Sequence, residues 1–234
     1  MKCIIDPKIF TTFPGVSTGV LTIYDMVNDS NVEEITSLLR QEEARQKTAL
    51  TGIELGSLPE LSAWREIYRA FGSNPKDFRS SVESLLRRAR AGGKPIPDIN
   101  PLVNIYNYLS LKYHMPVGAE DLDKVTGDIA LGFAIGTERG KALGSDAEVV
   151  CDPGEVIYKD DGGFLCRRWN WREADRTKID NRTHNAIMVI EKVPAIPLDS
   201  FQEALTEAKR LMEQHLGGRC EIIIMNADKT ITEL

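Results

Sequence analysis

The chain has 234 residues, of which 42% are hydrophobic and 27% are charged, and its formal net charge at pH 7 is −6. This composition is typical of a globular protein with a sizeable core and excludes a disordered chain. The acidic charge argues against a protein that coats nucleic acid by bulk electrostatics, and the apolar runs are too short to span a bilayer. We expect one compact domain over residues 1–234, without membrane contact. Since the N-terminus lacks a secretory pattern, we expect it in the cytoplasm.

The cysteines and histidines give no sign of a metal site or a disulfide framework. Their spacing shows no CxxC pair and no Cys/His ligand pattern. Buried thiols that pack as small hydrophobic groups are the simpler expectation in a cytoplasmic protein. We therefore expect no metal and no cofactor. The cysteines are Cys3, Cys151, Cys166 and Cys220.

The first 93 residues are expected to be mostly helical after one strand at 18–27, which alternates and is rich in branched residues. Three Ser-x-x-Glu capping boxes predict helix starts. Glycines near 52, 72 and 92–93 mark the expected helix ends. The three boxes are Ser30–Glu33, Ser57–Glu60 and Ser80–Glu83.

The segment GGKPIPDINP, residues 92–101, separates this helical part from residues 94–234, where we expect the core that carries the site. Pro101 predicts the start of a helix reaching to about residue 114. Asn104 and Asn107 lie three residues apart on it and project on nearly the same face. Because asparagine is a poor helix former, the two amides need partners, which are either neighbouring loops or a ligand.

From residue 127 onward the pattern changes to strands. Alternating or apolar stretches predict strands at 127–136, 155–160, 164–171, 185–193 and 220–226, and DDGG predicts a turn between the second and third. Asp199 opens an amphipathic helix that ends at Leu216, before two glycines. The sequence thus predicts an α/β or α+β fold in which a mixed sheet is flanked by helices.

The segment CRRWNWREADRT, residues 166–177, concentrates arginine, tryptophan and carboxylate side chains. Arginine and tryptophan both favour directed partners, so the cluster serves either the fold or a ligand. In the first interpretation the tryptophans anchor the core while the arginines pair with carboxylates such as Asp121. In the second, arginines hold phosphate and a tryptophan stacks on a base.

Motifs for nucleotide-dependent chemistry are missing. The sequence has no Walker loop, no GxGxxG between strand and helix, no HExxH and no GxSxG. The remaining candidates are the arginine–tryptophan cluster, the asparagine-bearing helix, and the stretch PVGAEDLDKVTG, residues 116–127.

At these three places the chain resembles a known family. Four motifs follow one another in the order seen in the B3/B4 domain of the phenylalanyl-tRNA synthetase beta chain. They are PDINPLVNIYNYLSLKYHMPVGAEDLDKVTGDI, a PGEVIYKDDGG hairpin, RRWNWRE, and RT before Thr-x-x-Ala at 183–186. The resemblance covers about residues 78–193 and is strongest to free-standing versions of that domain. It implies an α/β module that hydrolyses the ester of a mischarged tRNA.

The resemblance places Asn107, Gly118 and Glu173 at the pocket, with Glu173 and Asn107 as the catalytic candidates. The chain departs from the synthetase by carrying Gly118 in place of a histidine, and RRWNWRE in place of a glycine-rich loop. The other substrate-binding candidates are Asn104, Asp121, Arg167, Arg168, Trp169, Asn170, Trp171 and Arg172.

Two functions are compatible with these residues. In the first, the protein removes a wrong amino acid from the 3′ end of a tRNA: a carboxylate positions water and an amide donates to the ester oxygen. In the second, it binds tRNA or a free amino acid without hydrolysis, which the missing histidine favours. Only the tRNA end needs to enter, so few phosphate contacts are needed and a negative net charge is tolerable.

Overall fold

The computed structural model describes residues 1–29, 33–91 and 94–234. The helices are α1 (Pro7–Thr12), α2 (Glu33–Ala49), α3 (Pro59–Ala70), α4 (Ser81–Ala91), α5 (Pro101–Tyr113) and α6 (Leu198–Leu216), with 3-10 turns η1 (Leu55–Ser57) and η2 (Leu122–Lys124). The strands are β1 (Lys2–Ile5), β2 (Ser17–Tyr24), β3 (Val117–Asp121), β4 (Ile129–Phe133), β5 (Arg139–Lys141), β6 (Glu148–Val150), β7 (Val156–Asp160), β8 (Gly163–Arg167), β9 (Arg172–Glu173), β10 (Ala186–Lys192), β11 (Arg219–Met225) and β12 (Ile231–Glu233). Within these ranges no helix is long and apolar enough to cross a membrane.

The strands form two main sheets. One is four-stranded and antiparallel, in the order β11-β2-β10-β3. The other has the order β12-β1-β4-β7-β8-β9 and is mixed, because β1 runs parallel to β4 and antiparallel to β12. The predicted α/β class with a mixed sheet is therefore confirmed, although the sequence did not indicate that the strands divide into two sheets.

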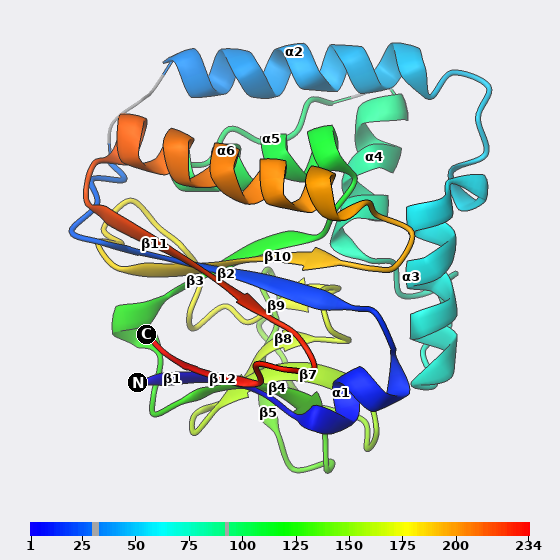
Figure 1. Cartoon of the computed structure of the whole chain (residues 1–234), viewed down its shortest axis with the longest axis vertical. Coiled ribbons are helices and arrows are strands. Elements are labelled where there is room, and N and C mark those ends of the chain that lie inside the picture. Colours follow the sequence, from blue (N-terminus) through cyan, green and yellow to red (C-terminus); the bar gives the residue numbers. More distant parts are fainter. Residues whose placement is uncertain (30–32, 92–93) are drawn as a thin grey trace.

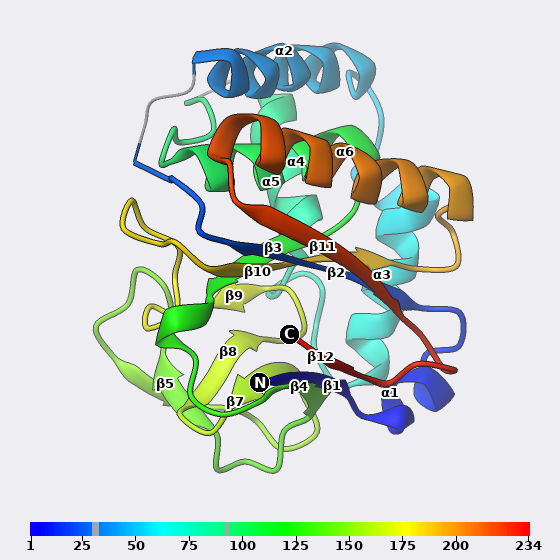
Figure 2. The same ribbon diagram turned by 60° about the vertical axis from the view of Figure 1, so that its left-hand side comes forward.

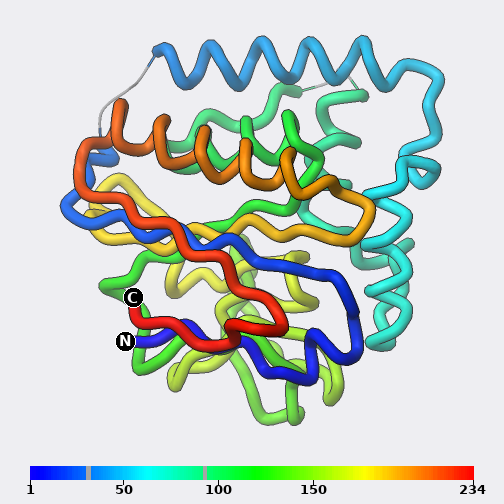
Figure 3. Tube along the Cα trace, viewed as in Figure 1, coloured from blue at the N-terminus to red at the C-terminus, as the bar shows by residue number. Residues whose placement is uncertain are grey.

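The elements stack in layers. In Figures 1 and 2 helix α2 is outermost, α5 and α6 lie beneath it, the four-stranded sheet follows, and the six-stranded sheet lies on its far side. The tube in Figure 3 shows the first and last segments side by side, as the pairing of β1 with β12 requires. One apolar cluster runs through the helices and both sheets.

Strand β10 contributes a different face to each layer. A side chain added at Gly19 on β2 would collide with Leu205 of α6, and Gly19 pairs with Ile190. Paired residues on adjacent strands point to the same face of a sheet, so Ile190 faces the helices as Gly19 does. Residues 186 and 188 face the helices too, because every second residue of a strand lies on the same face. Ile187, Val189 and Glu191 consequently face the second sheet.

The predicted helix starts have three different outcomes. Ser80 caps α4, because its hydroxyl accepts from the Glu83 amide at 3.4 Å. The Ser57 box is wrong: α3 begins after Leu58, and the Ser57 hydroxyl donates instead to the Glu54 carbonyl. Pro59 at the first helical position supplies the start signal that replaced it. Ser30 and the expected helix end at 92–93 lie outside the described residues.

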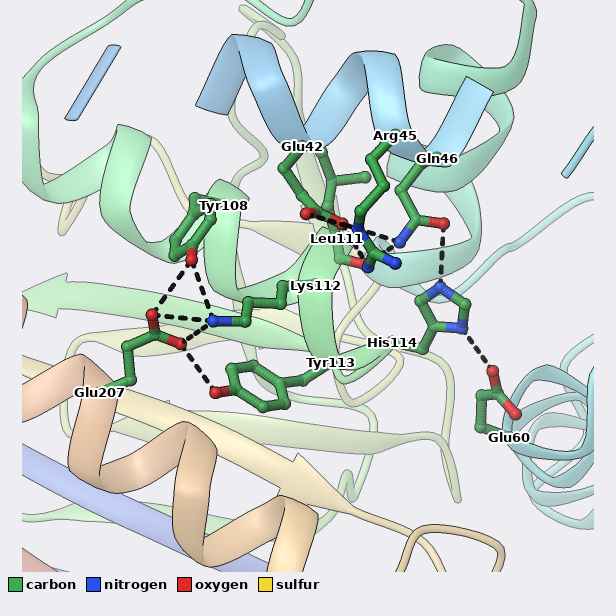
Figure 4. Close-up of polar contacts among 10 residues, drawn as sticks. All are labelled: Glu42, Arg45, Gln46, Glu60, Tyr108, Leu111, Lys112, Tyr113, His114 and Glu207. Atoms are coloured by element: carbon green, nitrogen blue, oxygen red, sulfur yellow. Dashed lines mark hydrogen bonds and ion pairs between the residues drawn. The ribbon is translucent and has the colours of Figure 1, made fainter. Parts of the chain in front are cut away.

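Two polar clusters tie the helical layer together (Figure 4). His114, in the left-handed conformation at the end of α5, contacts Glu60 of α3 and Gln46 of α2. Glu207 of α6 accepts from three groups of α5: the two hydroxyls of Tyr108 and Tyr113, and the Lys112 ammonium group at 2.7 Å.

Replacing Glu207 with alanine is expected to lower the free energy of unfolding by about 1–3 kcal/mol, because three donors on α5 lose their shared acceptor. Glu203→Ala is the matched control, since Glu203 is an exposed carboxylate on the same helix. Urea unfolding of both variants measures the difference. Equal stability of the two would show that the Glu207 cluster does not hold α6 to α5.

Candidate functional site

A cavity of about 330 Å³ lies between the two sheets. Strands β3 and β10 form one wall, β7, β8 and the turn before β9 form the opposite wall, and α4 and α5 close one end. The lining is mostly apolar but carries three glutamates: Glu120, Glu173 and Glu191. Burial of three carboxyl groups is costly, so their partners decide what the cavity can hold.

Glu191 is satisfied by the protein itself. Its Oε1 atom accepts from the Tyr158 hydroxyl at 2.7 Å and the Trp169 indole at 2.5 Å, and its Oε2 accepts from the Asn170 amide at 2.6 Å. Asn170 in turn accepts from the Tyr68 hydroxyl. Burial raises the pKa of Glu191 to about 7, and the three donors act in the opposite direction.

Glu173 and Glu120 lack comparable support. Burial raises the pKa of Glu173 to about 7, opposed by the Ala119 backbone amide. The pKa of Glu120 is raised well above its usual range by burial and then by the nearby Glu173 charge. Two carboxyl groups that repel each other at this range hold at least one proton between them at neutral pH.

Gly118 sets the position of Glu173. A Cβ atom at Gly118 would stand 3.0 Å from Glu173 Oε1, so the carboxyl group would have to move by a few tenths of an ångström. Gly118 and Glu120 lie two residues apart on β3 and therefore point to the same face of the sheet. Their partners on β10, Val189 and Ile187, point to that face as well. The absence of a side chain at residue 118 therefore leaves space for the Glu173 carboxyl group.

The structure brings most of the predicted site residues to this cavity. Asn107 lines the cavity, and its side-chain amide forms no hydrogen bond with any residue that the structure describes, so it is free to bind a ligand there. The predicted residues that line the cavity are Asn107, Gly118, Trp169, Asn170, Trp171, Arg172 and Glu173.

The other four predicted residues are not among those lining the cavity. Asn104 binds Asp98 and Thr36 and so braces the loop before α5. Asp121 accepts from the Thr183 hydroxyl and pairs with Lys124.

The two remaining predicted residues are Arg167 and Arg168, which form internal ion pairs. Arg167 binds Glu155 through two nitrogens, at 2.9 and 2.7 Å. Arg168 binds Asp152 and lies 3.7 Å from the centre of the Phe78 ring.

The expected strand over 164–171 is wrong beyond Arg167. Arg168 and Trp169 both have left-handed backbone conformations, with φ of 49° and 67°, so the chain turns instead of continuing to alternate. The Trp169 amide donates to the Val156 carbonyl, and the Trp171 amide donates to the Arg167 carbonyl. The turn directs Trp169 into the core and Asn170 toward Glu191.

The two tryptophans consequently differ. Trp169 is only 2% exposed and packs edge-on against Trp64 and Phe13, so its ring anchors the core. Trp171 is half-buried and packs edge-on against Phe78. Both rings line the cavity, and Trp171 is the more exposed of the two.

A second hollow of about 550 Å³ adjoins the cavity. It lies between the start of α5 and the loop at 178–182, and both hollows are lined by Tyr106, Leu143 and Glu173. Burial raises the pKa of Tyr106 well above 10, so its hydroxyl stays protonated and can donate a hydrogen bond. Glu173 therefore stands where the two hollows meet.

Sequence reasoning missed several lining residues, including Glu120, Glu191, Tyr106 and Tyr158. Glu191 interrupts an apolar stretch, AIMVIEKV, and a charged residue within a buried strand is a signal that could have identified it. Glu120 gave no comparable signal, because β3 was not predicted as a strand.

Comparison with known proteins gives two matches. The family profile described as the B3/4 domain matches residues 63–217. Among solved structures, the chain is similar to an N-terminal fragment of the phenylalanyl-tRNA synthetase beta-subunit from Pyrococcus horikoshii, with 12% identity, a TM-score of 0.47, and coverage of 95% of this chain and 53% of that fragment. The chain thus spans about half the length of the fragment. No curated protein matches its sequence significantly.

Arg167→Ala is expected to lower the free energy of unfolding by about 1.5–3 kcal/mol, because Glu155 is 1% exposed and would lose its two short bonds to Arg167, keeping only the longer contact with Arg168 at 3.5 Å. Arg172→Ala, an exposed change in the same segment, is expected to stay within about 0.5 kcal/mol. Thermal and urea unfolding compare the two. A stable Arg167→Ala protein would contradict the bracing role of this arginine.

Proposed function

Because the chain belongs to the B3/4 domain family, we propose that it binds the aminoacyl end of a tRNA and hydrolyses the ester of a mischarged tRNA. The family match, at residues 63–217, includes every residue that lines the cavity. The resemblance of the sequence to the editing domain of the synthetase beta chain supports this reaction.

Glu173 is the observation on which the proposal rests. It lies in a shielded cavity with a pKa of about 7, so near neutral pH a large fraction is ionised and the remainder carries a proton. The ionised carboxylate takes a proton from water as the water oxygen attacks the ester carbonyl carbon. The protonated acid then returns this proton to the ribose oxygen as the carbon–oxygen bond breaks.

Two donors can stabilise the oxyanion that forms during this attack. The Asn107 amide has no partner among the described residues, and the Tyr106 hydroxyl stays protonated. Both line the cavity together with Glu173. Donors fixed in advance in a shielded site are the usual source of oxyanion stabilisation. Cys166 is a poor alternative nucleophile, because burial raises the pKa of its thiol well above the usual value.

The second hollow fits the terminal nucleotide of the tRNA. It shares Glu173 with the inner cavity, so an ester placed at Glu173 would have its amino acid on one side and its ribose on the other. Lys178 and Arg182 line the outer hollow, and Arg88 and Arg172 are exposed at the inner one. These few cations can contact the terminal phosphates despite the net charge of −6.

The alternative is a module that binds an aminoacylated tRNA or an amino acid without hydrolysing anything. The observation in its favour is Gly118, which stands where the synthetase domain carries a histidine. In this case the cavity would discriminate ligands by shape and charge, and Glu173 would act in binding alone.

A panel of mischarged tRNAs distinguishes the two functions. We expect release of the amino acid above the rate without protein, and Glu173→Gln should reduce it by about 10²–10⁴-fold. Since the ionised form accepts the proton, the protein-dependent rate should rise with pH through about 7 and then level off. Saturable binding of the same tRNAs with no release would exclude editing and favour the binding module.

Gly118→Ala tests the positioning of Glu173. The new methyl group would shift the carboxyl group by a few tenths of an ångström, so hydrolysis should fall by roughly 3- to 10-fold, while the free energy of unfolding changes by less than about 1 kcal/mol. Gly132→Ala on β4 is the control, because its nearest neighbour would be 3.5 Å away. Unchanged activity in Gly118→Ala would mean that the position of Glu173 does not matter for the reaction.

A further inference from the structure

Glu120 and Glu173, which are half-buried in the wall of the cavity, differ from the buried carboxylates of the described chain. Glu83 is paired with Arg65 and Arg87, and Glu155 is paired with Arg167. Within the described ranges, by contrast, neither Glu120 nor Glu173 forms an ion pair or receives a hydrogen bond from a side chain within normal distance. Because the protein satisfies its other buried carboxylates, these two point to a partner supplied from outside.

The atoms of Glu120 show where such a partner would bind. Its Oε2 atom is covered and has no hydrogen-bond partner within normal distance; the Thr177 hydroxyl acts on Glu120 as a long hydrogen-bond donor and lowers its pKa. Glu120 as a whole is only half-buried, and its Oε1 atom is not covered in this way. Oε1 is therefore the atom that a ligand in the cavity can reach.

The charged groups around Glu120 do not neutralise it. Arg176 lowers the pKa of Glu120, but its guanidinium group is bound to Asp160 at 2.6 Å, and Asp160 itself raises that pKa. On the other sides lie Glu173 of β9 and Tyr106 of α5, whose pKa is raised by both glutamates. None of these neighbours offers Glu120 a free positive charge, so a cation that entered the cavity would favour the ionised form of Glu120 and pair with it.

We propose that Glu120, with Glu173 beside it, is the receptor for the ammonium group of the bound amino acid. The proposal rests on the function inferred above and names its substrate class: esters of amino acids with a free amine, rather than N-acylated or peptidyl esters. Glu120 is thus a specificity-determining residue, whereas Glu173 keeps the role of base.

The pairing would also couple recognition to chemistry. An ammonium group at Glu120 replaces the proton that the two carboxyl groups hold at neutral pH, so binding releases a proton to solvent. The same positive charge favours the ionised form of Glu173. A ligand with a blocked amine gives neither effect and leaves Glu173 more often protonated.

Non-hydrolysable conjugates test the receptor apart from hydrolysis. The probes are 3′-aminoacylamino-3′-deoxyadenosines carrying apolar, aromatic or polar amino acids, each with a free and with an acetylated amine. For any conjugate that binds, calorimetry at pH 7 should show that acetylation weakens binding roughly 10- to 100-fold. Titrations in buffers of different ionisation enthalpy should show release of about one proton, with the free amine alone.

Glu120→Gln is the matching variant, because it keeps the shape of the side chain and removes the charge. It should weaken binding of the free amine to the level of the acetylated form, leave the acetylated form unchanged, and abolish proton release. Glu148→Gln, an exposed change on β6, controls for the loss of one negative charge and should bind like the original protein. An unaltered thermal midpoint verifies that Glu120→Gln is folded.

The possible outcomes separate the two proposals. Equal affinity for free and acetylated conjugates, or no binding of any free-amine conjugate, would overturn the ammonium receptor. Hydrolysis of mischarged tRNA, measured in parallel, tests the editing function independently of the ammonium receptor. If acetylated and free aminoacyl-tRNA are hydrolysed at the same rate, editing stands and the role of Glu120 is wrong.

Discussion

The carboxylate of Glu191 is the link on which the site depends. It projects from β10 of the four-stranded sheet and is bound by Tyr158 of β7 and by Trp169 and Asn170 of the turn that follows β8. A buried carboxylate without such donors would be expensive, so the contact fixes how the two sheets face each other. The cavity lies beside this link, and Gly118 contributes no side chain to its wall.

Local signals were sufficient for much of the fold. Proline at the first turn of α5, the Ser80 cap of α4 and the apolar run along β10 each depend on a few neighbouring residues, and the structure agrees with them. The continuation of a strand beyond Arg167 was predicted from composition and was wrong, because the left-handed conformations of Arg168 and Trp169 are maintained by distant partners such as Val156. Such long-range contacts leave no periodic trace in the sequence.

The candidate site shows the same division. Residues with an unusual setting in the sequence, such as Asn107 and Trp171, lie at the cavity as expected. Arg167 and Arg168 looked equally promising, but their carboxylate partners come from Asp152 and Glu155, and the sequence does not say which arginines will be used internally. Glu120 was overlooked because its importance comes from the partner it lacks, and a missing partner becomes visible only once the neighbours are placed.

The order of strands in the four-stranded sheet determines which residues a truncated fragment of this protein must include. The family match starts at residue 63, after β2, and ends at residue 217, before β11. Yet β2 lies between β10 and β11, and β10 supplies the wall that carries Glu191. An excised fragment limited to the matched residues would expose an unpaired edge of β10 to solvent and to other copies, which invites aggregation. The segment that matches the family is therefore smaller than the set of strands that completes this sheet.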